Sequence, residues 1–448
     1  MKGNTEFPLI YYLFAMILGG LLVFTAFSSP AATIALLALS TAAFLISQRS
    51  VNRFLWLAFF VAGSSLQVIV PRNFEPGNVE YTGYVTRGGT GLVEASEGKI
   101  LINGNWFSLR DTVQIRLSKS SEELYTGQII WAAGKMEVRS IFPLYIIDSS
   151  ADGHFDRFRL LSLPGRYSRD KLKKYGLLDT MACSVFLGDK RSMESNTKNE
   201  ISDLGVAHLF AVSGLHIGMM YLFANYALSR FLLGRRTKLI LSASLIFLYT
   251  MATGPSISAM RSFLMLAIYS FFRFIDYRQH PLNVLGLTGI IMTLSQPSIV
   301  ASISFQLSFF ATAMLLIFLP VFTGYNLMFQ AFMTGVIAQI AIVPLSLNVF
   351  GTLSVASIPL TILMVPLFII PSYIGVISLM IFDALNLSPI CDFLAGALKQ
   401  LSKIFVISTE TISGLIPVMR LEGVAAYLVS LSLLFCVFFS LWHFGHKP

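Results

Sequence analysis

Residues 208–218 read His-Leu-Phe-Ala-Val-Ser-Gly-Leu-His-Ile-Gly, and they place polar side chains inside an otherwise apolar segment. His208, Ser213 and His216 stand among large apolar residues, and Gly214 follows the serine directly. Polar groups at the depth of a bilayer are costly unless they pair with a neighbour or face a wet cavity. The stretch therefore predicts a membrane-embedded region that carries a functional polar site.

The composition of the whole chain predicts a membrane protein. Of its 448 residues, 55% are hydrophobic and only 12% are charged, whereas a soluble domain carries about 25% charged residues. The mean hydropathy is +0.71, and many apolar runs approach the roughly 20 residues that cross a hydrocarbon core. The formal net charge of +9 has two interpretations. Basic residues gather in cytoplasmic loops of membrane proteins, and they also attract polyanions such as DNA.

The N-terminal part predicts three transmembrane helices, which we assign to residues 1–70. Apolar runs cover about 9–27, 31–47 and 54–70, and Arg49 and Arg53 stand between the second and third. Because basic loops stay in the cytoplasm, we expect this link and the N-terminus on that side. The residues after Val70 are then exported.

Residues 71–150 have the pattern of a small exported β-domain. Short runs alternate apolar and polar residues, and Gly88-Gly89 and Asn103-Gly104 mark turns between them. This spacing is typical of a small barrel or sandwich. Aromatic and basic side chains of such a domain either contact nucleic acid or, as is commoner for aromatics, fill the core. The residues that would supply a contact surface are Tyr81, Tyr84, Arg87, Trp106, Phe107 and Arg110.

Residues 151–180 predict a basic amphipathic linker at the membrane surface. Arginines and lysines between 157 and 174 are mixed with leucine, phenylalanine and tyrosine, which is typical of a helix lying on a membrane. The same charges would also suit a positively charged approach to a DNA channel, and both interpretations stay open. The residues that we single out for DNA contact here are Arg166, Lys173 and Lys174.

Residues 181–448 return to membrane character and predict a polytopic channel domain. Basic loops near 230–238 and 273–278 are expected in the cytoplasm. Glycines and prolines interrupt several apolar runs, and broken helices at membrane depth face protein or a water-filled cavity. The run 355–382 is therefore expected as one helix or as two halves. The apolar runs cover about 239–253, 258–274, 282–295, 299–320, 327–350, 355–382, 392–417 and 423–442.

The polar residues of 208–218 allow several kinds of chemistry. His208 and His216 are separated by about 12 Å along a straight helix, too far to share a metal whose ligands lie about 2 Å away. The three cysteines stand far apart in apolar surroundings and form no disulfide or zinc pattern. Ser213 and His216 could act as nucleophile and base of an intramembrane hydrolase. The other interpretations are hydrogen bonds to neighbouring helices and a wet pore.

Several segments resemble one known family. The run HLFAVSGLHIG is similar to the hallmark of the ComEC-type competence proteins, which form DNA-uptake channels. Other segments resemble that family in the same order, although Thr361 stands where the family often has asparagine. These segments are Gly153-His154-Phe155-Asp156, Leu187-Gly188-Asp189, the run TGPSISAMR ending at Arg261, the run FQLSF containing Gln306 and Ser308, and Phe350-Gly351 with Ser354.

The resemblance implies a fold and a task. The fold is a polytopic α-helical membrane protein of the bacterial cytoplasmic (inner) membrane, with an inserted, exported small β-domain that is OB-like. The task is to carry single-stranded DNA into the cytoplasm during natural transformation. The implied partners are single-stranded DNA, a DNA receptor, a cytoplasmic helicase or ATPase, a separate nuclease and membrane lipids, and homo-oligomerisation stays open. The residues that would line or shape the DNA path are Asp189, His208, Ser213, Gly214, His216, Arg261, Gln306 and Ser308.

No catalytic residue, metal or cofactor is expected. Many members of the resembled family continue into a metallo-β-lactamase-like domain, but this sequence contains no His-x-His-x-Asp-His motif and ends at Pro448. We therefore expect no intrinsic nuclease activity. An intramembrane hydrolase that uses Ser213 and His216, and a small-solute transporter, remain as alternative functions.

Overall fold

The computed structural model describes residues 12–18, 61, 77–87, 92–102, 105–109, 113–117, 129–138, 145–153, 159–188, 193, 195–296, 299–300, 302–350, 352–354, 356–413 and 419–420. Residues 12–18 are helical, in line with the first predicted apolar run. The other two N-terminal runs, except position 61, and the run 423–442 lie outside the described residues. The chain divides into two compact units, Met1–Arg166 with Gly214–Gln306 and Tyr167–Ser213 with Leu307–Pro448.

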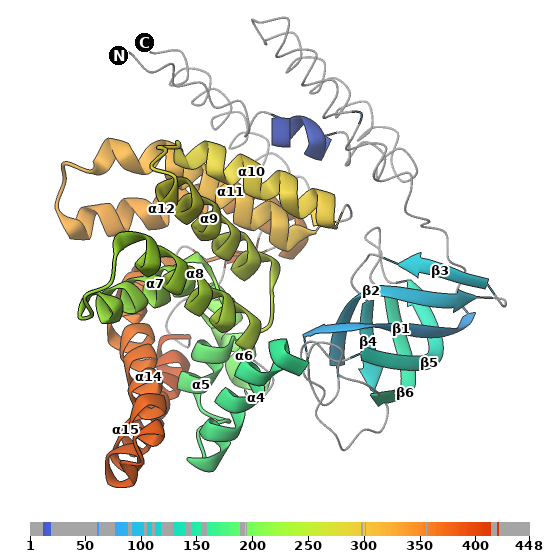
Figure 1. Ribbon diagram of the computed structural model, residues 1–448, viewed down its shortest axis with the longest axis horizontal. Coiled ribbons are helices and arrows are strands. Elements are labelled where there is room, and N and C mark those ends of the chain that lie inside the picture. Colours follow the sequence, from blue (N-terminus) through green and yellow to red (C-terminus); the bar gives the residue numbers. More distant parts are fainter. Residues whose placement is uncertain are drawn as a thin grey trace, which may run out of the picture. The chain divides into compact units, whose positions relative to one another are not determined.

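The first unit contains a sheet of six strands. They are β1 (Gly77–Arg87), β2 (Leu92–Ile102), β3 (Asn105–Leu109), β4 (Val113–Leu117), β5 (Ile129–Val138) and β6 (Tyr145–Gly153). Strand β1 pairs with both β2 and β5, β5 pairs with β6, and β4 pairs with β6 and β2. The sheet therefore closes on itself into a small barrel, and β3 extends it as the partner of β2 (Figure 1).

Alternate residues of the strands fill the barrel. Val79, Tyr81, Val93 and Ile115 are buried in one apolar cluster with their counterparts on other strands, as the period of two along a strand requires. Of the two alternatives for Tyr81, the core position is confirmed and the contact surface is excluded, because this ring is fully buried. Burial also raises the pKa of its hydroxyl above the ordinary value. A side chain at Gly83 would overlap the Tyr81 ring, which explains the glycine.

The same unit contains four consecutive helices, α7 (Gly214–Ser229), α8 (Arg235–Ala252), α9 (Ile257–Phe274) and α10 (Pro281–Ser295). Helix α7 packs on α8 and α9, α8 packs on α9, and α9 packs on α10. The shape of the turn between α8 and α9 is set by residues within the turn itself. Gly254 adopts φ +82°, which favours glycine, and the Ser256 side chain caps α9 by accepting from the amide of Ala259.

The second unit is also helical and is built around α14 and α15. Its elements include α5 (Met181–Leu187), α6 (Ser195–Asp203), η1 (Ala207–Phe210), η3 (Leu319–Phe322), α12 (Leu327–Phe350), α13 (Ser357–Met364), η4 (Val365–Ile369), α14 (Ile370–Ala384) and α15 (Ser388–Ser413). Helix α14 packs on α15 and α5, and α15 also contacts α6. Phe210, Phe368 and Phe405 form a buried aromatic cluster, with the last two rings stacked at 4.1 Å.

Two helices cross the boundary between the units in sequence, α4 (Arg159–Lys174) and α11 (Ile303–Phe318). Helix α4 lies where the basic amphipathic segment was predicted. The run 355–382 is a continuous helix from α13 through η4 to α14, so the one-helix alternative is confirmed. A π-helical turn at η4 accommodates Pro366, since proline removes a backbone donor from the regular ladder.

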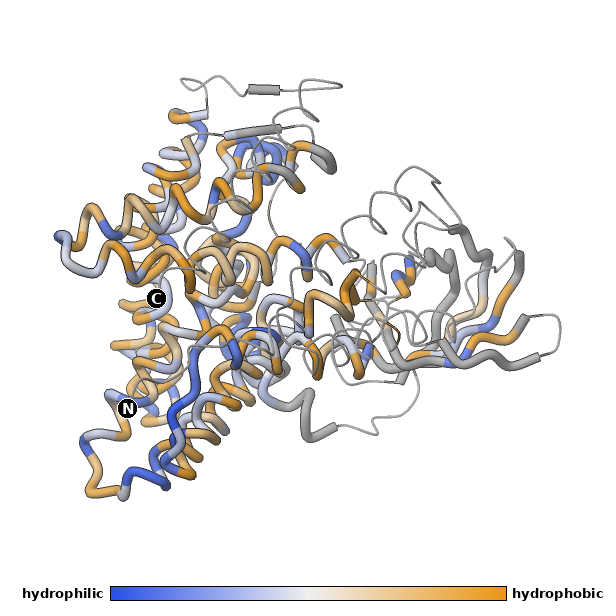
Figure 2. The backbone as a smooth tube through the Cα atoms, turned by 90° about the horizontal axis from the view of Figure 1, so that it is seen from above, coloured by the Kyte–Doolittle hydropathy of each residue, from blue (hydrophilic) through white to orange (hydrophobic). Residues whose placement is uncertain are grey.

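The helices have the length and composition of membrane spans. Within the described residues, Ile257–Phe274, Ile303–Phe322 and Ser357–Ala384 are long and apolar enough to cross a bilayer, and Pro281–Ser295 and Leu327–Val343 are shorter apolar helices. Figure 2 shows hydrophobic residues predominating along the helical segments. Exposed leucine, isoleucine and phenylalanine side chains are numerous on these helices, which is expected where lipid replaces water. The protein is a helical membrane protein with a small β-domain.

Candidate functional site

Residues 208–218 form two elements and not one straight helix. His208 belongs to the short 3-10 helix η1, and the chain is extended at Ala211. Helix α7 then begins at Gly214. The division between the two units also falls here, after Ser213. The polar stretch is therefore a junction, with His208 and Ser213 in one unit and Gly214 and His216 in the other.

The start of α7 receives the side chain of Arg261. A Cβ atom at Gly214 would lie 3.4 Å from Arg261 Nη2 and 3.3 Å from the hydroxyl oxygen of Ser262. Because Gly214 has no side chain, the guanidinium comes close to the α7 backbone. His216 lies in the first turn of the same helix and is fully buried. Among the predicted path residues, the structure thus brings Gly214, His216 and Arg261 to the neighbouring ends of two helices.

Arg261 is a buried cation. Only 6% of the residue is exposed, although arginine stays charged in proteins. Its Nη2 lies 3.3 Å from the Ser262 hydroxyl, and its Nη1 lies 3.7 Å from the sulfur of Met265. The capped turn before α9 sets its position, since Arg261 follows the N-cap Ser256 by little more than one helical turn. Helix starts carry partial positive charge, so the guanidinium and the first turns of α7 and α9 together favour an anion.

Other predicted path residues have local roles. His208 is exposed on η1, and its Nδ1 lies 3.1 Å from the carbonyl oxygen of Gly205. Gln306 is half-buried, and its Nε2 donates to the carbonyl of Val300 at 2.9 Å. That bond closes the loop before α11. Ser308 is half-buried, and its carbonyl accepts from the Thr312 hydroxyl at 2.8 Å.

The predicted DNA-contacting residues belong to several different elements. Arg87 ends β1, Trp106 lies in β3 and Arg166 lies in α4, all on described backbone. Asp189 and Arg110 lie outside the described residues. Lys173 is exposed on α4. Lys174 is also exposed, but its ammonium is held by an acid of the protein itself.

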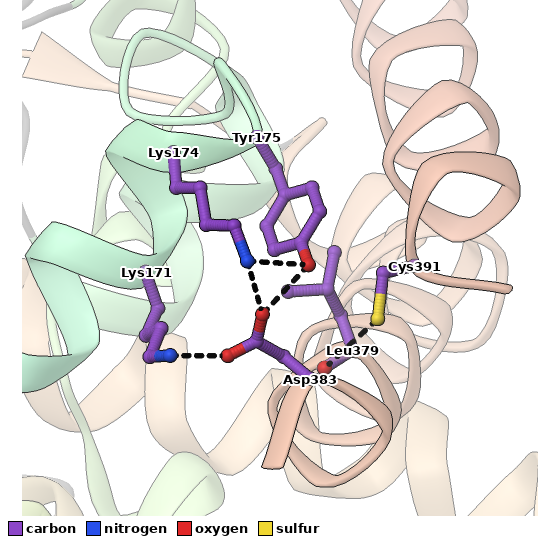
Figure 3. Close-up of polar contacts among 6 residues, drawn as sticks. All are labelled: Lys171, Lys174, Tyr175, Leu379, Asp383 and Cys391. Carbon is purple, nitrogen blue, oxygen red and sulfur yellow. Dashed lines mark hydrogen bonds and ion pairs between the residues drawn. The ribbon is translucent and has the colours of Figure 1, made fainter. Parts of the chain in front are cut away.

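That acid is Asp383, which sequence reasoning missed (Figure 3). Its side chain is only 3% exposed and lies at the end of α14, where Lys171 and Lys174 of α4 both form ion pairs with it. Lys174 Nζ lies 2.8 Å from Oδ1, and the Tyr175 hydroxyl donates to the same oxygen at 2.7 Å. The sequence signal was an acid at the end of a long apolar run. This cluster fixes the end of α4 on α14.

The Asp383 carboxylate raises the pKa of both Lys174 and Tyr175. The hydrogen bond to Asp383 is the main cause that raises the pKa of Tyr175 to about 12. The same carboxylate, as hydrogen-bond acceptor, raises the pKa of Lys174 above its ordinary value. Both side chains therefore keep their protons throughout the neutral range.

A second junction lies where Ser354 and Ser357 pack against the turn at Gly205. Gly205, with φ +73°, lies against Ser354 and Ser357, and the Ser354 hydroxyl donates to the carbonyl of Leu204 at 2.9 Å. Ser357 in turn donates to Gln339 Oε1 at 3.2 Å. Ser354 is part of a segment that resembles the family, but the sequence does not indicate which residue it contacts. The structure shows that it packs against the turn that leads into η1.

The described part of the chain contains no group of three or more histidine, cysteine, aspartate or glutamate side chains that could hold a metal ion. Cys183 and Cys391 are buried cysteines outside any disulfide, and the Cys391 sulfur lies 3.8 Å from the carbonyl of Leu379. The arrangement therefore consists of a buried cation at helix ends, together with separate polar junctions.

Comparisons with known proteins show which family and which proteins this chain resembles. A family model described as Competence protein matches residues 185–444. ComE operon protein 3 of Bacillus subtilis (strain 168) is 29% identical over 205 residues, which cover 45% of this chain and 26% of that protein. An uncharacterized protein of Aquifex aeolicus (strain VF5) is 31% identical over 233 residues, which cover 51% and 54% of the two chains.

A third relative is the uncharacterized protein MG316 homolog of Mycoplasma pneumoniae, 26% identical over 180 residues, which cover 39% of this chain and 46% of that protein. No solved structure matches. The chain spans from about a quarter to about half of the length of these curated relatives. The family model, in contrast, covers more than half of this chain. The chain therefore belongs to the Competence protein family.

Proposed function

We propose that this protein is a channel of the bacterial inner membrane that carries single-stranded DNA into the cytoplasm during natural transformation. Membership of the Competence protein family and the similarity to a ComE operon protein support a role in competence. The membrane-span helices support a transport role. The proposed partners are single-stranded DNA, a DNA receptor, a cytoplasmic helicase or ATPase, and a separate nuclease.

The observation that carries the proposal is the buried guanidinium of Arg261. It lies beside Gly214 at the first turn of α7, within helices that are mostly apolar. A guanidinium matches the oxygens of a phosphate in shape and charge, and helix starts strengthen the attraction. A cation in a membrane span is expensive and is typical of a substrate pathway. We propose that successive DNA phosphates pass this point.

Transit requires that no single contact is too tight, because a strand must leave each site that it enters. The other predicted path residues suit this requirement. His208 is exposed on η1, and Ser308 and Gln306 are half-buried on α11. They offer weak, dispersed hydrogen-bonding groups, whereas Arg261 offers the charge. The proposal contains no covalent step and no cofactor.

We further propose that the β-domain is OB-like and lies on the exported side. The ring β1-β2-β4-β6-β5 is a closed barrel of short strands in which β4 and β6 run parallel. An OB-fold is a five-stranded Greek-key barrel of this kind, and it commonly binds single strands. The basic ends of α8 and α9 meet through the ion pair of Arg235 with Asp276. Because positive charge marks the cytoplasmic side, we propose that these basic ends face the cytoplasm.

The test is DNA entry in a naturally competent host that carries only variant copies of the gene. Arg261→Gln should leave DNA bound outside while entry into the cytosol falls by at least tenfold, and Arg261→Lys should keep part of the entry because it keeps the charge. Arg230→Gln is the matched control, since Arg230 is exposed and lies over the ring of Tyr226. Normal entry with Arg261→Gln, at normal protein level, would overturn the proposal.

A further inference from the structure

The ends of α8 and α9 form a basic pocket, which we call the hairpin pocket. Its volume is about 280 Å³. Its lining includes Gly234, Arg235 and Arg236 at the start of α8, and Arg273, Phe274 and Asp276 at the end of α9. Three guanidinium groups thus meet one carboxylate, which leaves the pocket positively charged at neutral pH.

Arg235 builds the pocket. Its Nη1 lies 2.9 Å from Asp276 Oδ1, and its Nη2 donates to the carbonyl of Arg273 at 3.1 Å. Through these two bonds the start of α8 is tied to the last turn of α9. Asp276 adopts φ +57°, a conformation that aspartate and asparagine tolerate better than most residues. The loop after α9 therefore turns its carboxylate back toward α8.

Arg236 and Arg273 are held by aromatic rings. The Cζ atom of Arg236 lies 5.2 Å from the ring centre of Phe274, and that of Arg273 lies 5.9 Å from the ring centre of Tyr269. Arg236 also lies 3.7 Å from Asp276 Oδ2, a long contact for an ion pair. A guanidinium that lies over an aromatic ring still has N–H groups to donate to a planar or tetrahedral oxyanion. These two side chains are therefore arranged in advance for such a ligand.

The backbone adds to the charge. The N-cap of α8 is Gly234, which makes no side-chain capping bond. The first amide groups of a helix have no partner within the helix, and their dipoles favour an anion at this end. The pocket therefore combines a cavity, stacked arginines and a helix start, and their common preference is for phosphate.

The position of the pocket points to a phospholipid as the source of that phosphate. The apolar span Ile257–Phe274 ends at the pocket. Around this end Tyr269, Phe271 and Tyr277 are between 41% and 60% exposed, as in the aromatic belts that mark the headgroup level. Arg261 lies about 20 Å farther along the helix. The hairpin pocket is thus a separate site from Arg261.

We propose that the hairpin pocket binds the phosphate of an anionic phospholipid headgroup. Basic pockets between membrane helices on the cytoplasmic side bind such headgroups. The bound phosphate bridges Arg236 and Arg273 and competes with Asp276 for Arg236. The lipid would thereby fix the α8–α9 hairpin at the membrane surface.

The experiment is native mass spectrometry of the purified full-length protein, with phosphatidylglycerol and phosphatidylcholine as probes. The double variant Arg236→Gln/Arg273→Gln should weaken phosphatidylglycerol binding about 25-fold, from about fivefold per basic residue. The matched control is Arg230→Gln/Arg278→Gln, which removes the same charge from exposed positions outside the pocket. This control should bind within about twofold of the native protein.

A variant that is expected to tighten lipid binding distinguishes a loss of binding from misfolding. Asp276→Asn keeps the tolerated backbone conformation but removes the competing carboxylate, so it should tighten phosphatidylglycerol binding several-fold. Equal binding by the native protein, the double variant and Asp276→Asn would overturn the proposal. Competition by inorganic phosphate at the same concentration as the lipid would show a free-phosphate site, and pocket-dependent binding of an oligonucleotide alone would show a DNA site. Either result would contradict the lipid assignment.

Discussion

Replacement of Gly205 by alanine tests the junction that leads into η1. Gly205 has φ +73°, and a Cβ atom there would lie 2.8 Å from the Cβ of Ser354 and 3.0 Å from that of Ser357. The left-handed conformation costs a residue with a side chain about 1–2 kcal/mol. Neither serine Cβ can rotate away, and overpacking costs about 1–3 kcal/mol. We therefore expect Gly205→Ala to lower the free energy of unfolding by roughly 2–5 kcal/mol.

The assay is unfolding of the purified protein in mixed detergent micelles with increasing SDS, followed by circular dichroism. Gly396→Ala is the matched control. Gly396 lies within α15 in the same unit, and no heavy atom lies within 4 Å of its would-be Cβ. Alanine in a helix interior should stabilise the protein by up to about 1 kcal/mol. If Gly205→Ala and Gly396→Ala unfold at the same SDS concentration, the predicted strain at Gly205 is refuted.

A double variant locates the cause. Ser354→Gly removes the nearest Cβ, but it also removes the hydroxyl that donates to Leu204, which costs about 1 kcal/mol alone. Combined with Gly205→Ala, it should destabilise less than the two single changes together, because one change relieves the overlap that the other creates. Strict additivity would show that the overlap with Ser354 is not the source of the cost.

Three further predictions concern titration, the α7 start and covalent chemistry. The pKa of Tyr175 is raised to about 12 in the folded protein, compared with about 10 in the unfolded chain. The hydrogen bond of its protonated hydroxyl therefore contributes stability that is fully present below pH about 10 and is lost as pH rises toward 12. Unfolding midpoints measured across that range should therefore fall more steeply for the native protein than for Tyr175→Phe, and equal slopes would contradict this assignment. Gly214→Val should reduce DNA entry at normal protein level, because a branched side chain must displace the guanidinium of Arg261, whereas Gly214→Ala requires a shift of only a few tenths of an ångström. A serine-reactive fluorophosphonate should label native protein and Ser213→Ala equally, and labelling that depends on Ser213 would favour an intramembrane hydrolase.

The helical part of the fold could be predicted because its signals are local. The run 327–350 matches the bounds of α12, and the runs 258–274 and 282–295 differ from α9 and α10 by one residue. Span length and the turn residues Gly254, Pro255 and Ser256 set these limits. For residues 71–150 the sequence predicts a small barrel or a sandwich, and the structure shows a closed barrel. The inward-facing residues could be predicted because side chains alternate along a strand.

The tertiary pairings could not be predicted. Lys174 and Asp383 are 209 residues apart in the sequence, and no local pattern joins a lysine of the basic helix to one acid at the end of an apolar run. For the same reason the local sequence around Lys174 indicates DNA contact and not an ion pair with Asp383. The proximity of Gly214 to Arg261 likewise depends on the packing of α7 against α9. Sequence reasoning identified both residues but did not place them together.

The most direct measurement of the central proposal follows labelled DNA into the cytosol of a naturally competent host whose copy of this gene is deleted, then restored with native or Arg261→Gln protein. The account predicts that deletion leaves DNA bound outside and abolishes entry, that the native gene restores entry, and that Arg261→Gln at equal protein level does not. Unchanged entry of DNA after deletion would contradict the assignment of this protein as the channel.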